Sequence, residues 1–195
     1  MILQIYRDRI LAGQEATYST IEEDAARICV ARGCPHPHIA IESLRQPTEV
    51  WWLNAYESEA QREQVFAAYG HNAALMAALS EILERKKGVV AVPEEVFATY
   101  SPELSVGAES WPCNARFFVV TTDRPRRPDA LVFDAPGARR YVFHLARELA
   151  VAQAIASEPG AVYAVRPYWG MPAPEWIAAD PEFWSVNPAA RSILR

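Results

Sequence analysis

The chain has 195 residues and a formal net charge of −5, from 24 acidic and 19 basic residues. This length fits one large domain or two small ones, and the acidic balance argues against nucleic acid as a partner. The sequence shows no signal peptide and no apolar run close to the ~20 residues of a membrane span. Its three cysteines are too few, and odd in number, for a disulfide framework. We therefore expect a cytoplasmic protein without membrane contact.

The first half of the chain predicts strands that alternate with helices. The patterns predict, in order, a strand at 3–9, a helix at 14–31, strands at 38–44 and 49–56, a helix at 58–87 and a strand at 95–100. Gly33 stands where a glycine commonly closes a helix. Ser58 and Gln61 have the spacing of a capping box, and Gly70 predicts a break or a kink in the long second helix.

The second half changes in character from about residue 109. Its patterns predict a strand at 116–122, extended segments at 131–133 and 141–144, a helix at 146–157 and a strand at 161–168. We therefore divide the chain into a first domain at 1–108 and a second α+β half at 109–195. The tail after residue 168 is rich in proline and tryptophan, and it is expected to pack onto a domain or onto a partner subunit.

The element order in residues 1–105 resembles the dimeric α+β barrel (ferredoxin-like) superfamily. The segments 4–7, followed by Gly13, and 50–58 are similar to antibiotic-biosynthesis-monooxygenase-like and NIPSNAP-like members. This resemblance implies an α+β fold in which a βαββαβ sheet pairs with a second sheet, usually from a second subunit, so a homodimer is expected. The alternative is that residues 109–170 form a degenerate second copy and close the barrel within one chain.

Side-chain alternation assigns the two faces of the strands. The wholly apolar set of the third strand is expected to face the helices: Trp51, Leu53 and Ala55. Trp52, Asn54 and Tyr56 would then lie on the other face, together with Tyr6 of the first strand. Aromatic rings with a few polar groups suit a small organic ligand. The alternative is that these rings fill a barrel interior or a subunit interface.

Histidines and cysteines supply the remaining candidate groups. His71 could act as an acid or base, because a histidine titrates near neutral pH. Cys29, Cys34, His36 and His38 include soft metal ligands, but the cysteines lack the C-x₂-C spacing and Cys29 falls within the helix. We therefore predict no metal site. Departures from the haem-degrading relatives, and the lack of any nucleotide-binding motif, lead us to predict no cofactor.

The leading functional hypothesis is a protein that binds a small apolar organic molecule, with cofactor-independent oxygenation as the activity that the resemblance implies. Tyr6, Trp52 and Tyr56 would pack the substrate, Asn54 would stabilise an anion, and His71 would act as the base. The alternative hypothesis is a non-enzymatic binding or interaction protein whose barrel interior is packed with aromatic residues.

Overall fold

The computed structural model describes residues 1–44, 49–91, 93–105, 115–122, 130–156 and 161–166. The first half contains β1 (Ile2–Arg9), α1 (Glu15–Arg32), β2 (Ile39–Ser43), β3 (Glu49–Tyr56), α2 (Glu59–His71), α3 (Ala73–Lys86) and β4 (Glu94–Tyr100). The second half contains the η1 turn (Pro102–Leu104), β5 (Phe117–Thr121), β6 (Ala130–Ala135), β7 (Arg139–Ala146), α4 (Leu149–Ile155) and β8 (Ala161–Arg166). The predicted βαββαβ order of the first half is confirmed. Within the described residues, no helix is both long and apolar enough to span a bilayer.

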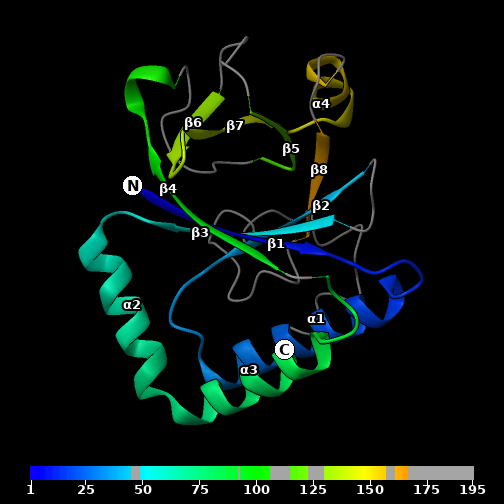
Figure 1. The fold of residues 1–195 in the computed structure, drawn as a ribbon, viewed down its shortest axis with the longest axis vertical. Coiled ribbons are helices and arrows are strands. Elements are labelled where there is room, and N and C mark those ends of the chain that lie inside the picture. The colour runs from blue at the N-terminus through cyan, green and yellow to red at the C-terminus, as the bar shows by residue number, and fades with distance from the viewer. Residues whose placement is uncertain (45–48, 92, 106–114, 123–129, 157–160, 167–195) are drawn as a thin grey trace.

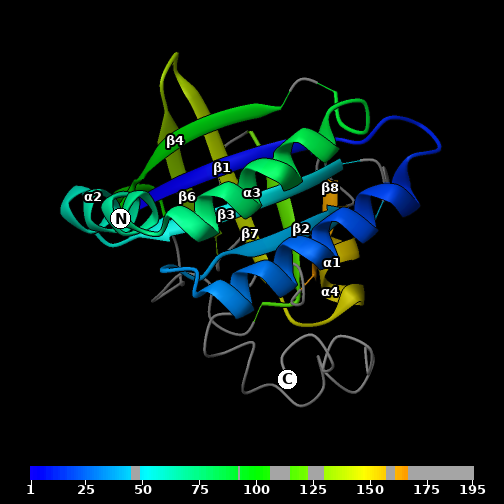
Figure 2. The ribbon, with the colours of Figure 1, turned by 90° about the horizontal axis from the view of Figure 1, so that it is seen from below.

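The eight strands form one closed antiparallel barrel, with α1 and α3 lying across the outer face of the first-half strands (Figures 1 and 2). The order around the barrel is β1-β3-β2-β8-β5-β7-β6-β4. Two seams join the halves: β2 pairs with β8, where Ile41 faces Val165, and β4 pairs with β6, where Tyr100 faces Phe133. The barrel therefore closes within a single chain, and its closure does not depend on a second subunit.

The two halves repeat the same strand order. The first half runs β4-β1-β3-β2 across its sheet, and the second half runs β8-β5-β7-β6 in the matching positions. In this comparison α4 takes the place of α2 and α3. The eight positions 122–129 between β5 and β6 are too few for a counterpart of the 18-residue α1. The second half is thus a degenerate copy of the first, which was the alternative to closure of the barrel by a second subunit.

Local signals fix the helix ends. Gly33 closes α1 in the left-handed region, at φ 68°. The Ser58 side chain caps α2 by accepting a hydrogen bond from the Gln61 amide at 3.2 Å. Gly70 does not break the helix as predicted. The break falls at Asn72, whose side chain caps α3, because a side-chain acceptor satisfies the first free amides of a new helix and a glycine has no such group.

Trp51 points into the barrel, which corrects the predicted assignment of faces. Its ring centroid lies 5.8 Å from that of Tyr141 and 5.4 Å from that of Tyr163, on β7 and β8. Leu53 belongs to the same core cluster. Trp52 points the other way, and its indole Nε1 donates to the Tyr18 hydroxyl of α1 at 3.1 Å.

The other residues that were expected to line a pocket away from the helices also lie on the helix side. Tyr56 packs its ring edge-on against Phe66 of α2, at 6.1 Å between centroids. Gln4 and Asn54 face each other on β1 and β3 and share this side with Tyr6 and Tyr56. The prediction failed because both faces of β3 are apolar: the interior of a closed barrel excludes water as fully as a helix-covered face does.

Two predictions fall outside the described residues. These are the boundary between residues 108 and 109 and the packing of the tail after residue 168.

Candidate functional site

Polar side chains on the outer face of β1, β3 and β4 form one hydrogen-bonded group, which we call the Gln4 cluster. It consists of Gln4, Tyr6, Asn54, Tyr56 and Glu95. Gln4 is 3% exposed and stands at its centre. The Gln4 Oε1 atom accepts from Asn54 Nδ2 at 3.1 Å and from the Tyr56 hydroxyl at 2.8 Å. Its Nε2 donates to Glu95 Oε1 at 2.7 Å and to the Tyr6 hydroxyl at 3.1 Å. Every polar atom of the Gln4 amide group is thus engaged within the protein.

Two polar atoms in and beside the cluster lack a partner among the described residues. Asn54 Oδ1 and Arg62 Nε are both buried without a hydrogen bond. Arg62 comes from α2, and its guanidinium lies 5.0 Å above the ring of Phe97, which faces Gln4 across the β1–β4 pair. A buried polar group without a partner is costly, so such atoms commonly mark the place of a ligand or a water.

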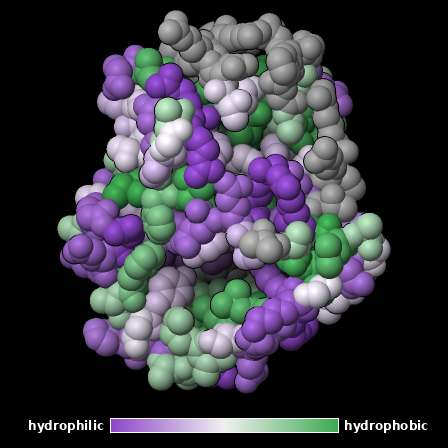
Figure 3. All heavy atoms as spheres, in the orientation of Figure 1, coloured by the Kyte–Doolittle hydropathy of each residue, from purple (hydrophilic) through white to green (hydrophobic). Residues whose placement is uncertain are grey.

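Helix α2 covers the cluster loosely. Only Val65 of its 13 residues is buried. Phe66, which packs against Tyr56, is 43% exposed. Figure 3 shows hydrophobic residues at the surface among hydrophilic ones over the lower, helical part of the molecule. The layer between α2 and the sheet therefore offers apolar surface next to polar groups.

His36 lies against the Gln4 cluster, which the sequence did not predict. Its ring stacks on Tyr56 with 4.6 Å between centroids, and its Nε2 lies 2.9 Å from the Ala55 carbonyl oxygen. Nε2 must carry the proton to donate to that carbonyl, which leaves Nδ1 as the basic nitrogen. Burial lowers the pKa of His36 and outweighs the opposing carbonyl bond. At neutral pH the imidazole is therefore neutral and able to accept a proton.

Burial keeps the two phenols of the cluster protonated. It raises the pKa of Tyr56 to about 12, although the charge of Arg62 opposes this rise. Burial and the neighbouring Glu95 carboxylate also raise the pKa of Tyr6. Both hydroxyls therefore remain hydrogen-bond donors at neutral pH.

A second buried network lies between β1, α1 and α3. Asp8 and Glu22 are 5% and 2% exposed, and the Lys86 ammonium pairs with both, at 3.1 Å from Asp8 Oδ2. The Tyr18 hydroxyl donates to the same Asp8 oxygen at 2.8 Å. Lys86 also lies 5.4 Å above the ring of Trp52. This network joins the helices to the sheet, and through Trp52 it borders the Gln4 cluster at Tyr6.

The barrel interior is packed around a third polar group. Glu49 accepts two hydrogen bonds from the Arg7 guanidinium, at 3.0 and 2.9 Å. It also accepts from Trp51 Nε1 at 2.6 Å and from the Tyr163 hydroxyl at 2.7 Å. Burial opposes ionisation of Glu49, but these donors outweigh it and lower its pKa. Aromatic rings fill the space beside this group: Trp51, Phe118, Phe133, Tyr141, Phe143 and Tyr163.

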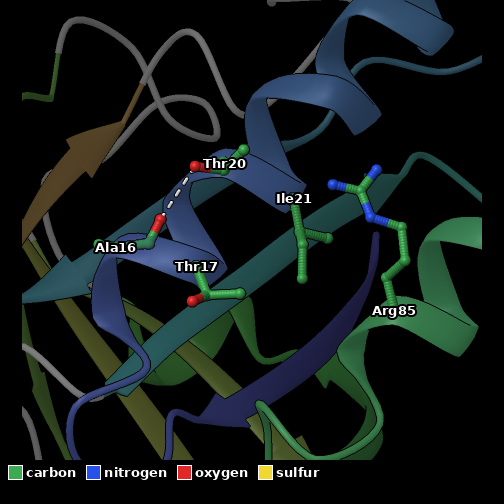
Figure 4. A pocket seen from close by; sticks show the side chains of 5 residues that line it. All are labelled: Ala16, Thr17, Thr20, Ile21 and Arg85. Atoms are coloured by element: carbon green, nitrogen blue, oxygen red, sulfur yellow. Dashed lines mark hydrogen bonds between the residues drawn. The ribbon is translucent and has the colours of Figure 1, made fainter.

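A groove of about 500 Å³ lies between α1 and α3 (Figure 4). Its lining is Ala16, Thr17, Thr20, Ile21 and Arg85. Thr20 uses its hydroxyl to bond the Ala16 carbonyl oxygen at 3.1 Å, and Arg85 pairs with Asp24 at 2.8 Å. The groove thus has few free polar groups, and no candidate residue from the sequence lines it.

Comparison with solved structures identifies the fold. A proposed monooxygenase from Fusobacterium nucleatum superposes with a TM-score of 0.51 and 12% identity, over 84% of this chain and 91% of that one. An anthrone oxidase-like protein superposes with a TM-score of 0.50 and 8% identity, over 85% and 91%. The chain has the dimeric α+β barrel fold. No protein-family model matches the sequence, and no curated protein sequence matches it.

In this α+β barrel the predicted site residues lie in two places. Tyr6, Asn54 and Tyr56 come together in the Gln4 cluster. Trp52 lies beside them, opposite Tyr6 in the β1–β3 pair, and also contacts Lys86 of the Asp8–Lys86 network. His71 is the exposed last residue of α2, and among the described residues no hydrogen bond or ring contact joins it to the cluster.

Sequence reasoning missed Gln4, Arg62 and Glu95 as members of the site, and it placed His36 only in a metal-like set. Gln4 was visible as a polar residue that alternates with Leu3 and Ile5. Its neighbours depend on strand register, which alternation alone does not give. Among the described residues, no three metal-ligating side chains converge on one point.

Proposed function

We propose that the chain binds a small, largely apolar aromatic molecule with a hydroxyl group, in the layer between α2 and the Gln4 cluster. The single observation that carries this proposal is the buried Asn54 Oδ1 atom, which lacks a donor while the amide nitrogen of the same side chain is engaged. A ligand hydroxyl would supply the missing donor. Phe66 and Phe97 offer apolar surface on either side of Arg62.

This arrangement changes the role given to Asn54. Its Nδ2 donates to Gln4, so the free group is an acceptor, which suits a hydroxyl and not an anion. The guanidinium of Arg62 pairs with Glu59 through Nη2, but its buried Nε is a donor without a partner, which suits the negative charge that develops on a deprotonated substrate. Asn54 would thus orient the substrate, and Arg62 would stabilise the anion.

We propose cofactor-independent oxygenation as the activity, by analogy with the anthrone oxidase-like neighbour. His36 would serve as the base in place of His71, because it lies against Tyr56 and is held neutral. Deprotonated 2-hydroxyanthrone is electron-rich, and one molecule of it reacts with one O₂ to give 2-hydroxyanthraquinone and one water. The protein would supply the base, the anion stabiliser and a dry pocket.

The Asn54→Leu variant is expected to bind 2-hydroxyanthrone about tenfold more weakly than the parent, because one hydrogen bond from the ligand's ring hydroxyl is lost. Titration of intrinsic fluorescence with 2-hydroxyanthrone measures this change. The variant should still fold, since Gln4 Oε1 keeps the Tyr56 hydroxyl as a donor. Gln64→Leu, at an exposed position of α2, is the control and should bind as the parent does. Equal affinities of the Asn54→Leu variant and the parent would refute the site.

The second candidate function is ligand binding or protein interaction without catalysis. The observation that favours it is the aromatic packing of the barrel interior, because these rings contact one another instead of lining a substrate pocket. Oxygen uptake in the presence of 2-hydroxyanthrone separates the two candidates. Uptake above the uncatalysed rate, abolished in Asn54→Leu and Arg62→Met, supports the oxygenase; binding without uptake supports the second candidate.

We also propose a homodimer in the cytoplasm. A second copy would cover exposed hydrophobic side chains of α2 and α3, among which Phe66, Met76 and Leu83 are 43%, 41% and 62% exposed. The free thiols of Cys29 and Cys34 favour a reducing compartment. Light scattering should give twice the 21.8 kDa mass of one chain.

A further inference from the structure

The C-terminal end of α1 brings two cysteines together. Gly33 adopts φ 68° and ψ 68°, and the Cys34 amide donates to the Cys29 carbonyl oxygen at 3.0 Å. This is the backbone pattern of a Schellman motif, in which the side chain two positions past the helix contacts a side chain in its last turn. Here those two side chains are Cys29 and Cys34, so the backbone turn that ends α1 also brings two thiols together.

The two cysteine side chains lie in one buried core cluster and are not joined by a disulfide. Cys29 and Cys34 are 6% and 9% exposed. The neighbouring Cys29 thiol lowers the pKa of Cys34, burial opposes this, and the Tyr69 hydroxyl of α2 lowers it further. The neighbouring Cys34 thiol, together with burial, raises the pKa of Cys29. One thiol is therefore favoured as thiolate and the other as its proton donor.

We propose that Cys29 and Cys34 form a peroxide-reactive dithiol that closes to a reversible disulfide. The Cys34 thiolate attacks a hydroperoxide, the O–O bond breaks, and the sulfur takes one oxygen to become a sulfenic acid while hydroxide leaves. Cys29 then attacks this sulfur, an S–S bond forms, the S–O bond breaks, and the departing hydroxide takes the Cys29 proton as water. Two thiols and one hydrogen peroxide thus give one disulfide and two waters.

The surrounding contacts suit this chemistry. A disulfide needs Cβ atoms about 3.5–4.5 Å apart, and the Schellman motif already brings the two side chains together at the end of one helix. Tyr69 is the positioning residue, because it belongs to α2 and packs against the core cluster that holds both cysteines. Asn72 Nδ2 also holds the Arg32 carbonyl oxygen at 2.8 Å, which ties the end of α1 to the α2–α3 junction.

The test uses the full chain with Cys113→Ser, because Cys113 lies outside the described residues. After treatment with hydrogen peroxide, intact mass should show the loss of two hydrogens, both thiols should become unreactive, and peptide mapping should join Cys29 to Cys34. Dithiothreitol should restore both thiols. In Cys29→Ser, dimedone should trap a sulfenic acid on Cys34; in Cys34→Ser, Cys29 should stay reduced under the same treatment.

The proposal is overturned if the parent gains oxygen without forming a disulfide, or if Cys29 oxidises as fast in Cys34→Ser as Cys34 does in Cys29→Ser. Removing the Tyr69 hydroxyl in Tyr69→Phe should slow sulfenic acid formation on Cys34 several-fold. It should also raise the pH at which this reaction reaches half its maximal rate, an effect that a purely structural role of Tyr69 would not produce. Thermal unfolding of each variant checks that it folds.

Discussion

Replacing Lys86 with methionine is expected to lower the free energy of unfolding by about 3–5 kcal/mol. Lys86 is the ammonium between two buried carboxylates, Asp8 and Glu22. Without it, both carboxylates stay buried with no opposite charge, although Asp8 keeps the bond from the Tyr18 hydroxyl. Denaturant unfolding followed by circular dichroism measures the change.

The matched control is Lys87→Met. Lys87 is the next residue, and its ion pair with Glu84, at 2.7 Å from Oε2, is exposed to solvent. Exposed pairs contribute little, so this variant should differ from the parent by less than about 0.5 kcal/mol. A similar loss in both variants would show that the Asp8–Lys86 network is not the source of the stability.

The effect of Lys86→Met should also depend on pH. Burial raises the pKa of Glu22, and the Lys86 charge opposes that rise. Removing the charge raises the folded-state pKa further above its unfolded value, so stability falls as the pH rises through the interval between the two. The penalty should therefore be smaller at about pH 5 than at about pH 7. A penalty that does not change with pH would contradict the unpaired carboxylate as its cause.

Replacing Trp51 with alanine is expected to cost about 3–5 kcal/mol in the free energy of unfolding. Trp51 is 6% exposed and contacts Tyr141 and Tyr163 across the barrel. Its removal leaves a cavity, and Glu49 loses the indole donor. Guanidinium unfolding followed by far-UV circular dichroism tests the prediction without relying on the tryptophan signal.

Phe66→Ala is the control for Trp51→Ala. Phe66 is an aromatic residue of similar size, but it is 43% exposed on α2, so its removal should cost much less than that of Trp51. If Trp51→Ala were as mild as Phe66→Ala, the aromatic side chains would not fill the barrel interior. The barrel interior could then hold a ligand, and the layer between α2 and the Gln4 cluster would no longer be the preferred ligand site.

Much of the first half was predictable because its signals are local. The third strand was predicted at 49–56 and observed as β3 from Glu49 to Tyr56. Gly33 and Ser58 mark helix ends through the chemistry of one or two residues. The closure of the barrel was harder to predict, because the described residues of the second half contain one short helix, whereas the first half contains three longer ones.

The candidate site was predicted only in part, because its contacts depend on which face of a strand meets the helices. Tyr6, Asn54 and Tyr56 were grouped correctly by alternation, but the face was inverted, since Trp51 and Trp52 make both faces of β3 aromatic. His36 meets Tyr56 from a segment 20 positions earlier, which depends on the packing of the chain between α1 and β2. A local pattern contains no information about such a contact.

A crystal structure of the protein with 2-hydroxyanthrone tests most directly whether the ligand lies between α2 and the Gln4 cluster. We predict the ring system between Phe66 and the sheet, with the ligand hydroxyl oxygen about 2.7–3.2 Å from Asn54 Oδ1. 2-Hydroxyanthrone bound inside the barrel near Trp51, or in the groove beside Thr17 and Arg85, would contradict the proposed site.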